Sequence, residues 1–400
     1  MSRILVFAFD IAEAAQIRRI RSFAAAGFEV MSASMRRANM NRDFEPDWPD
    51  IHLFVTRNES PVRRAATILG AIVKMMRHRN VVAGSDMLVA RNFDMLAIAW
   101  ASRLMQRRGR PRLVYECLDI HGLFTREDFI GRAMRAAERF LLSRVDLLVT
   151  SSPGFVREYF DPVQKYRGPV AIIENKLWFD GEAIPRPAAP RQRQPGEPLV
   201  LGWIGSIRCA PSLDLLMATA DRLGDRVRIE IHGAVHHHAV PGFREAVAAR
   251  PNVRWFGPYR YPEGLAEVYA RCDLVWAQDL WQRGANSDWL LPNRIYEASW
   301  FGCPSVAVAD TETGRRIRGN NLGFVIGQPT APDLVALLEG LDPEAIAGCA
   351  EGLLRRDPHE FRLTVAEVRE AFLHLPEVRA RGAGARRAAT AEGQAAGPLR

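Results

Sequence analysis

The side chains whose types and spacing point most clearly to chemistry lie in residues 286–308, NSDWLLPNRIYEASWFGCPSVAV. Pro at a helix start and Gly at a helix end are favoured, so this segment predicts a helix that begins at Pro292. The free backbone amides of that start, together with Asn293 and Arg294, suit a diphosphate. Glu297 follows about one turn later and can accept hydrogen bonds from two neighbouring ribose hydroxyls. The alternative is that Glu297 forms only a local cap or ion pair.

A second group of polar side chains lies in residues 115–124, YECLDIHGLF, directly after a predicted strand. Asp119 and His121 are candidates to orient a reacting hydroxyl group. The alternative is that Asp119 caps the next turn and His121 packs against the following helix. Asp10 and Arg18 follow the first predicted strand and are further candidates at the same edge.

Short apolar runs alternate with helical stretches twice along the chain, and this alternation predicts the elements that hold these residues. In the first half we expect strands at 4–9, 28–33, 51–55, 87–90, 113–116, 147–150 and 170–173, and helices at 12–25, 94–106 and 127–142. In the second half we expect strands at 199–204, 227–232, 253–256, 274–277, 305–309 and 323–326, and helices at 212–223, 242–249, 261–270 and 292–300. Strands that alternate with helices in this way predict parallel sheets with right-handed crossovers.

The pattern therefore predicts an α/β protein with two Rossmann-like, doubly wound domains that face each other across a cleft. We expect the first domain at residues 1–180 and the second at 199–357, joined by a Pro-, Arg- and Gln-rich linker at 181–198. A C-terminal helix at 358–375 is expected to cross back to the first domain, and the Gly/Ala/Arg-rich tail at 376–400 to be disordered. Such a pair places the active site between the domains, at the carboxyl ends of the strands.

The charge of the chain is concentrated in its first half. The net charge is +8; residues 1–190 contain 29 Lys and Arg against 21 Asp and Glu, and the remaining residues contain 25 of each. The densest part is PVRRAATILGAIVKMMRHR at 61–79, which predicts a basic amphipathic helix. Such a helix can lie on an anionic membrane; an ordinary helix with a solvated polar face is the alternative. We assign an acceptor or membrane face to Asp10, Arg18, Arg63, Arg64, Lys74 and Arg77.

Other features exclude several classes of protein. No helix-turn-helix, zinc-finger or RNP-like motif accompanies the arginines, so nucleic acid is not an expected partner. The five cysteines show no CxxC spacing, which favours a reducing compartment over disulfides or a zinc cluster. His236–His238 is interpreted as a solvated loop, so no metal site is expected. Without an apolar run of ~18 residues or a signal peptide, the chain is expected to be cytoplasmic, at most peripheral on the inner face of the membrane.

The 286–308 segment resembles the P-N-K-x-x-E donor-binding motif of the family 4-type retaining glycosyltransferases, which have the GT-B fold. LGWIGSIR at 201–208 is similar to the first strand and glycine turn of their nucleotide-sugar domain. Residues 252–279 are similar to their nucleobase-side elements, and 145–176 to the end of their acceptor domain. The chain also resembles an exopolysaccharide (succinoglycan-type) branch, through ECLDIH, GSIRC and NSDWLLPNR.

The resemblance implies transfer of a hexose, with retention, from a nucleotide-diphosphate sugar to a glycan or lipid-linked oligosaccharide. The donor would be a UDP-sugar, with no metal or other cofactor, and the product would belong to a cell-surface polysaccharide. Donor binding is then expected from Gly205, Ser206, Arg208, Asp288, Asn293, Arg294 and Glu297. Catalytic roles are expected for Asp119, His121 and Arg208.

The chain departs from the family pattern at two places. Trp289 stands where many members have the first Glu of an E-x7-E pair, so the carboxylate is either missing or supplied by Asp288. Ser206 and Pro211 stand where members have an Arg and a Lys that hold the diphosphate, which leaves Arg208 as the nearby cation. Two other functions remain alternatives: a non-hydrolysing sugar-nucleotide epimerase, and a non-catalytic GT-B partner of a membrane biosynthetic complex.

Overall fold

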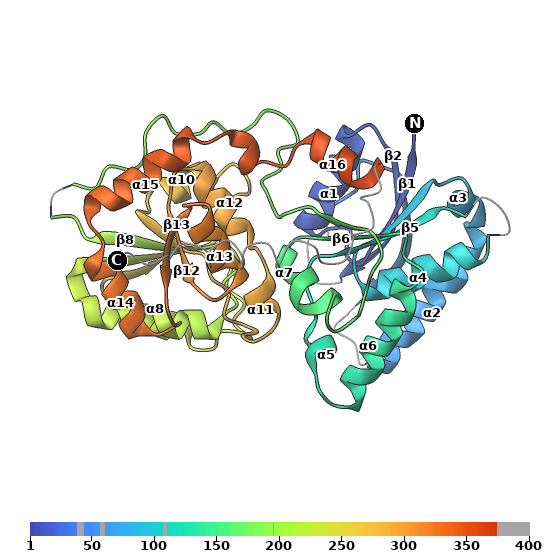
Figure 1. Ribbon diagram of the computed structural model, residues 1–400, viewed down its shortest axis with the longest axis horizontal. Coiled ribbons are helices and arrows are strands. Elements are labelled where there is room, and N and C mark those ends of the chain that lie inside the picture. Colours follow the sequence, from blue (N-terminus) through green and yellow to red (C-terminus); the bar gives the residue numbers. More distant parts are fainter. Residues whose placement is uncertain (38–43, 57–60, 107–109, 195, 374–400) are drawn as a thin grey trace, which may run out of the picture.

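A computed structural model describes residues 1–37, 44–56, 61–106, 110–194 and 196–373, which form two α/β domains (Figure 1). The N-terminal sheet has the order β3-β2-β1-β4-β5-β6-β7 and the C-terminal sheet the order β10-β9-β8-β11-β12-β13. All neighbouring strands in both sheets pair in parallel. In both sheets the winding reverses beside the first strand, which confirms the predicted α/β class with two doubly wound domains.

The strands of the N-terminal sheet are β1 (Arg3–Ala8), β2 (Glu29–Arg37), β3 (Asp50–Thr56), β4 (Met87–Ala90), β5 (Arg112–Cys117), β6 (Leu147–Thr150) and β7 (Val170–Ile172). Those of the C-terminal sheet are β8 (Leu199–Ile204), β9 (Val227–His232), β10 (Val253–Trp255), β11 (Leu274–Trp276), β12 (Ser305–Val308) and β13 (Gly323–Ile326). The central strands β4, β6, β8, β11 and β12 are buried at every position, because helices cover both faces of each sheet. This explains why they are continuous apolar runs in the sequence.

The N-terminal domain contains α1 (Ala14–Ala25), α2 (Pro61–Arg77), α3 (Arg79–Ala83), α4 (Phe93–Leu104), α5 (Gly122–Thr125), α6 (Phe129–Leu142) and α7 (Pro153–Phe155). The C-terminal domain contains α8 (Ala210–Leu223), α9 (Phe243–Ala248), α10 (Leu265–Ala270), α11 (Asn286–Trp289), α12 (Asn293–Trp300), α13 (Glu312–Gly319), α14 (Ala331–Gly340) and α15 (Pro343–Arg355); α16 (Val365–Leu373) follows. None of these helices is both long and apolar enough to span a lipid bilayer, over the residues that the structure describes.

The helix prediction differs from the structure mainly near the C-terminus. The sequence pattern gave no prediction for α13, α14 and α15, although Thr311, Thr330 and Asp342 cap them through side-chain oxygens. The helix expected at 261–270 begins only at Leu265, because Pro262 and Gly264 occupy its expected first turn.

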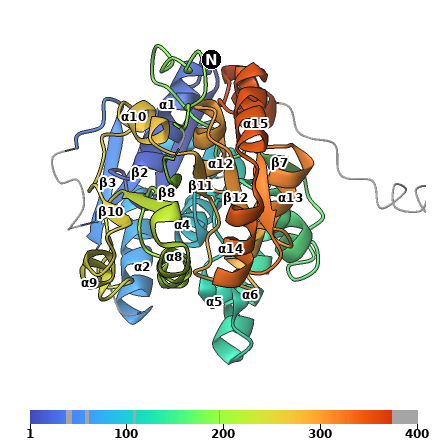
Figure 2. The ribbon, with the colours of Figure 1, turned by 90° about the vertical axis from the view of Figure 1, so that its left-hand side faces the viewer.

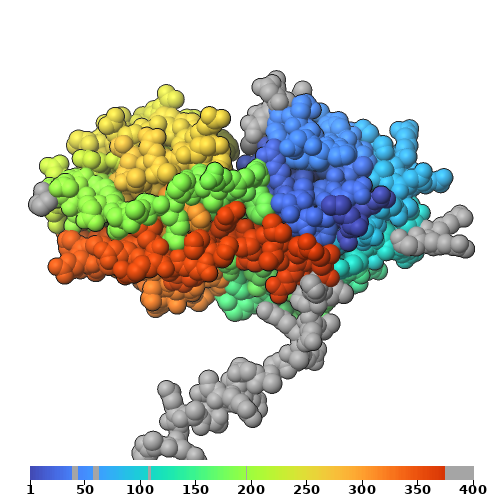
Figure 3. All heavy atoms as spheres, turned by 90° about the horizontal axis from the view of Figure 1, so that it is seen from above, coloured from blue at the N-terminus to red at the C-terminus, as the bar shows by residue number. Residues whose placement is uncertain are grey.

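The end of the described chain returns to the N-terminal domain. The segment from α15 to α16 forms a continuous band across both domains in Figure 3. Within it, the Phe372 ring of α16 packs against the Phe23 ring of α1 at a centroid distance of 4.7 Å. The tail expected to be disordered, 376–400, lies outside the described residues. Because α16 packs on α1, the chain couples the two domains twice, through the 181–198 segment and through this return.

Candidate active site between the two domains

The turn after β8, which we call the glycine turn, contains Gly205, so no side chain covers its backbone at that position. Gly205 has φ of +111°, and Gly233 after β9 has φ of +143°. A Cβ on Gly233 would lie 1.7 Å from the Gly205 carbonyl oxygen, so only glycine permits the two turns to approach. A Cβ on Gly205 would lie 3.7 Å from Arg294 Nε. The bare turn therefore faces the cationic start of α12.

The start of α12 presents free backbone amides and two polar side chains to this turn. Pro292 occupies the N-cap position and provides no side-chain cap, so the amides of Asn293 and Arg294 have no partner within the helix, whereas the Ile295 amide donates to the Pro292 carbonyl at 3.3 Å. Arg294, in the first turn, donates from Nη1 to the Trp276 carbonyl at 3.2 Å, which fixes its guanidinium beside the end of β11. Asn293 precedes it. The combined partial and full positive charges suit an anion such as a diphosphate.

Glu297 is buried one turn further along α12. Burial raises the pKa of its carboxyl above the usual value, and the charges of Arg18 and Arg294 and hydrogen bonds from Tyr269 and Tyr261 act in the opposite direction. The Tyr269 hydroxyl donates to Glu297 Oε2 at 3.1 Å. A carboxylate has lone pairs for several hydrogen bonds, so Glu297 can accept further ones from a vicinal diol. Its partners include residues of both domains, so Glu297 is more than a local cap.

Arg18 reaches this group from the N-terminal domain. Its guanidinium carbon lies 4.9 Å from the centre of the Tyr261 ring, which belongs to the C-terminal domain. Its charge also acts on Glu297. From the sequence, Arg18 was expected on an acceptor or membrane face. In the structure it lies against the side chains expected to bind the donor. The spacing of residues in α1 gave no signal for this contact, because the contact joins different domains.

Asp119 lies opposite the glycine turn and contacts the C-terminal domain. Asn286 Nδ2 donates to Asp119 Oδ1 at 3.2 Å, and the Ile120 amide donates to Asn286 Oδ1 at 2.7 Å. The Asp119 side chain is exposed, but the protein atoms around its carboxyl raise the pKa of that group by reducing its solvation. The hydrogen bond from Asn286 and the charge of Arg208 lower this pKa. Asp119 and Arg208 therefore share one space between the domains. Asn286 belongs to a quoted motif, but the sequence analysis gave it no role.

His121 and His236 have different positions around this site. His121 Nδ1 accepts from the Leu123 amide at 3.2 Å and so caps α5. The alternative interpretation gave this capping role to Asp119 and expected His121 to pack against the helix. His236 Nε2 lies 2.9 Å from Ser206 Oγ on the glycine turn, and its ring is partly buried. The interpretation of 236–238 as a solvated loop did not include this contact of His236 with the glycine turn. Burial, and the positive charge of nearby Arg208, lower the pKa of His236, which favours a neutral imidazole.

Trp289 and Asp288 are both held by partners within the protein. The Trp289 carbonyl accepts from Ser152 Oγ at 2.5 Å, and its ring stacks on Tyr159 at 6.4 Å, both in the N-terminal domain. A Cβ on Gly154 would lie 2.3 Å from the same carbonyl, so glycine permits this approach. Asp288 instead accepts from the Gly284 amide at 2.8 Å and pairs with Arg283 at 3.0 Å, within its own loop. Trp289, which stands where many family members have the first Glu, thus contacts the N-terminal domain and joins the two domains.

We expect Trp289→Ala to destabilise the protein by about 2 kcal/mol, because a large, well-packed ring is removed at the interdomain contact. The matched control is Trp281→Ala in the same loop, whose side chain is 48% exposed and should change stability by less than about 0.5 kcal/mol. Urea unfolding of both variants would test this. Equal stabilities of the two variants would contradict the anchoring role of Trp289.

The structure does not bring the remaining predicted residues into this group. Asp10 is buried below the carboxyl edge of β1, where it accepts from the Ala12 amide at 3.2 Å and lies 3.7 Å from Arg37. Arg63, Lys74 and Arg77 lie along α2. Arg64, also on α2, donates to Asp94 at 2.5 Å and lies near His121. The expectation that Asp10 lines an acceptor face is therefore wrong, because the side chain is inside the domain.

A buried ionic cluster lies below the site. Glu116, at the end of β5, is paired with Arg19 at 2.5 Å and with Arg91 at 2.6 Å, and all three side chains are buried. The charges of the two arginines lower the pKa of Glu116 against the opposing effect of burial. The cluster fixes the loops that follow β4 and β5 and the helix that carries Arg18.

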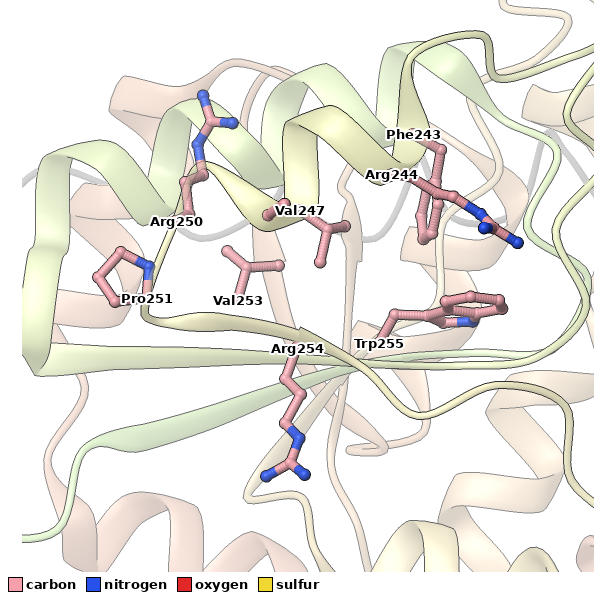
Figure 4. Close-up of a pocket in the computed structure, with 9 residues that line it drawn as sticks. Phe243, Arg244, Val247, Arg250, Pro251, Val253, Arg254 and Trp255 are labelled. Atoms are coloured by element: carbon pink, nitrogen blue, oxygen red, sulfur yellow. The ribbon is translucent and has the colours of Figure 1, made fainter.

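A cavity of about 480 Å³ lies elsewhere, between α9 and β10 (Figure 4). Phe243, Val247, Val253 and Trp255 form its apolar wall, and Arg244 lies at its rim. Figure 4 shows that Arg254 points to the other side of β10. None of the residues discussed above lines this cavity, so it is separate from the site between the domains.

Comparisons with known proteins agree on one fold. No family model matches the chain. Among solved structures, sucrose-phosphate synthase from Thermosynechococcus elongatus superposes with a TM-score of 0.73 at 12% identity, over 93% of this chain and 98% of that one. HepE from Anabaena, in complex with UDP and glucose, gives 0.63 at 13% identity, over 92% and 97%. WaaG, a glycosyltransferase involved in lipopolysaccharide biosynthesis, gives 0.58 at 14% identity, over 92% and 99%.

A closer similarity is found in sequence. The succinoglycan biosynthesis protein ExoL of Rhizobium meliloti is 36% identical over 360 residues, which cover 90% of this chain and 89% of that protein. An identity of this size over nearly the whole of both chains shows common descent. The chain therefore belongs to the family of the succinoglycan biosynthesis protein ExoL and has the GT-B fold of glycosyltransferases.

Proposed function

We propose that this protein transfers a hexose from a UDP-sugar to a hydroxyl group of a glycan or lipid-linked oligosaccharide, with retention of the anomeric configuration. The ExoL family and the GT-B fold support glycosyl transfer in exopolysaccharide synthesis. The binding of UDP and of UDP-glucose by HepE supports the choice of donor. The proposed acceptor lies at the inner face of the cytoplasmic membrane, which the basic N-terminal domain contacts.

The observation that carries the proposal is the group of cations around the bare Gly205 turn. Arg208 follows Gly205 in the same segment, Arg294 lies against Gly205 at the start of α12, and Arg18 of the N-terminal domain lies against Tyr261, with its charge acting on Glu297. These groups replace the Arg and Lys that are missing at Ser206 and Pro211. Glu297 lies at the position from which a carboxylate can bind the ribose hydroxyls of the same nucleotide.

The reaction needs charge stabilisation more than a strong base. The bond between the anomeric carbon and the diphosphate oxygen breaks, and negative charge develops on the diphosphate while the sugar becomes oxocarbenium-like. Arginine side chains and helix amides that already point at these oxygens stabilise that charge without reorganisation. The acceptor oxygen then bonds to the anomeric carbon on the face that the diphosphate leaves, and the departing phosphate oxygen takes the hydroxyl proton. We assign to Asp119 the role of orienting the acceptor hydroxyl.

UDP-glucose is expected to raise the thermal stability of the protein more than GDP- or ADP-glucose. A ligand that binds only the folded state adds ~2.7 kcal/mol at one hundred times its dissociation constant. Thermal unfolding with each nucleotide sugar would measure this, and a radiolabelled-sugar assay with and without EDTA would test transfer and the proposed independence from metal. No shift with any nucleotide sugar would contradict the donor site. Binding without transfer or donor hydrolysis would favour a non-catalytic partner.

A further inference from the structure

Three neighbouring helices of the N-terminal domain expose apolar side chains on their outer surface. α2, α4 and α6 lie side by side along the lower side of that domain (Figures 1 and 2). Thirteen large hydrophobic side chains are exposed among the described residues, and seven of them belong to these three helices. We call this region the three-helix surface; its main members are Leu69, Val73, Met76, Leu104, Phe129 and Phe140.

On α2 the exposed apolar side chains follow helical spacing. Leu69, Val73 and Met76 stand at positions i, i+4 and i+7, and their exposed fractions are 64%, 56% and 53%. The opposite side of the same helix carries Ala71 and Met75, which are buried against the sheet. The helix therefore has an apolar stripe toward the core and a second apolar stripe toward the outside. An ordinary surface helix has only the first.

On α6 the same arrangement extends over three turns. Phe129, Ala133, Ala136 and Phe140 stand at i, i+4, i+7 and i+11 and are all exposed, Phe129 at 74%. The Phe140 ring contacts the Trp100 ring of α4 at 5.3 Å, edge to face. This contact joins the outer sides of α4 and α6 into one apolar surface.

The charged residues of the three helices are almost all basic. Their sequences contain eight Lys and Arg but only two carboxylates, Asp94 and Glu138. Asp94 is 4% exposed and pairs with Arg64, and Glu138 is 1% exposed inside the domain. The residues within the three helices thus present to solvent only apolar, neutral polar and cationic groups. The exposed carboxylates of Glu127 and Asp128 precede α6, and that of Asp128 is paired with Arg126. A second copy of the same surface would bring cations against cations, which is unfavourable.

We propose that the three-helix surface docks this protein on an anionic lipid bilayer, with Leu69, Val73, Phe129 and Phe140 inserted at the headgroup level. Exposed apolar side chains flanked by Lys and Arg are the chemistry that anionic lipid recognises. The sequence indicates a membrane contact for α2 only. The structure adds α4 and α6, which the sequence pattern predicts as ordinary domain helices.

The position of the surface connects docking to the proposed reaction, and this step rests on the proposed function. α6 follows α5 and the loop that carries Asp119 and His121, so its exposed start lies at the carboxyl edge of the sheet. Arg64, in the first turns of α2, is close enough to His121 for its charge to act on the imidazole. A bilayer on this surface would bring a lipid-linked hydroxyl to the same edge as Asp119.

Vesicle flotation of the full chain tests the docking. We expect the wild type to bind phosphatidylcholine vesicles that contain phosphatidylglycerol, more weakly at high salt, and to bind pure phosphatidylcholine poorly. Leu69→Gln with Phe129→Gln should weaken binding at least tenfold, and Arg77→Gln with Arg132→Gln should remove most of the dependence on anionic lipid. The matched control is Val365→Gln with Leu373→Gln on α16, whose exposed apolar side chains are outside the surface.

The outcomes separate docking from catalysis. UDP-glucose binding in solution should be the same in all these variants, because none of the changed residues lies at the nucleotide site. Wild type that does not bind anionic vesicles, or a Leu69→Gln, Phe129→Gln variant that binds as well as the control, would overturn the proposal. A dimer in sedimentation analysis that the same variant dissociates would identify a second copy as the occupant and would also overturn it.

Discussion

Glu297→Ala is expected to lower the rate of sugar transfer at least tenfold without unfolding the protein. Each tenfold loss corresponds to about 1.4 kcal/mol of transition-state binding. Glu297 is buried beside Tyr269, and we propose that its carboxylate binds two ribose hydroxyls. The assay should report kcat and KM for the donor separately, because the loss of a ribose contact that is equally strong in the ground state and the transition state raises KM and leaves kcat unchanged.

A donor that lacks the ribose 2′-hydroxyl sharpens this test. Wild type should bind the 2′-deoxy donor more weakly than the natural donor, whereas Glu297→Ala should bind the two equally. The matched control is Tyr269→Phe, which removes a hydrogen bond to Glu297 but leaves the carboxylate in place, so it should still distinguish the two donors. If Glu297→Ala distinguishes them as well as wild type does, Glu297 has only a structural role.

Arg208→Ala is expected to reduce kcat/KM at least tenfold, again ~1.4 kcal/mol or more. Ser206 and Pro211 provide no cation at the places where the family pattern has Arg and Lys, so we propose that Arg208 interacts with the diphosphate on this side of the turn. The effect should fall on kcat, because the charge on the leaving diphosphate increases in the transition state. Initial rates with a UDP-sugar donor measure it.

Two variants make the Arg208 result specific. Arg208→Lys should keep part of the activity, because it keeps the charge but loses the planar, two-pronged donor. Arg222→Ala, an exposed arginine on α8 of the same domain, should leave the rate unchanged. Arg208 is itself exposed, so its replacement should change the free energy of unfolding by less than about 0.5 kcal/mol. Wild-type turnover by Arg208→Ala would remove Arg208 from the diphosphate site.

The local sequence determined the helices and strands of both domains, and the edge of the sheets at which the candidate site lies. The strands are short apolar runs because helices bury both faces of each sheet, and this burial is visible residue by residue. Gly205 and Gly233 mark turns that only glycine can form at such close approach. Asn293, Arg294 and Glu297 share one short helix, so their spacing alone places the amides, the guanidinium and the carboxylate near one another.

The tertiary structure alone decided which side chains meet across the two domains and which helix faces remain uncovered. Arg18 with Tyr261, Asp119 with Asn286, and Trp289 with Ser152 join residues more than one hundred positions apart, and no period in the sequence records such a pairing. Helical spacing shows that a face is apolar, but it does not show whether a neighbouring element covers that face. Phe129 and Phe140 are therefore core residues or surface residues according to how the chain packs, and packing leaves them exposed.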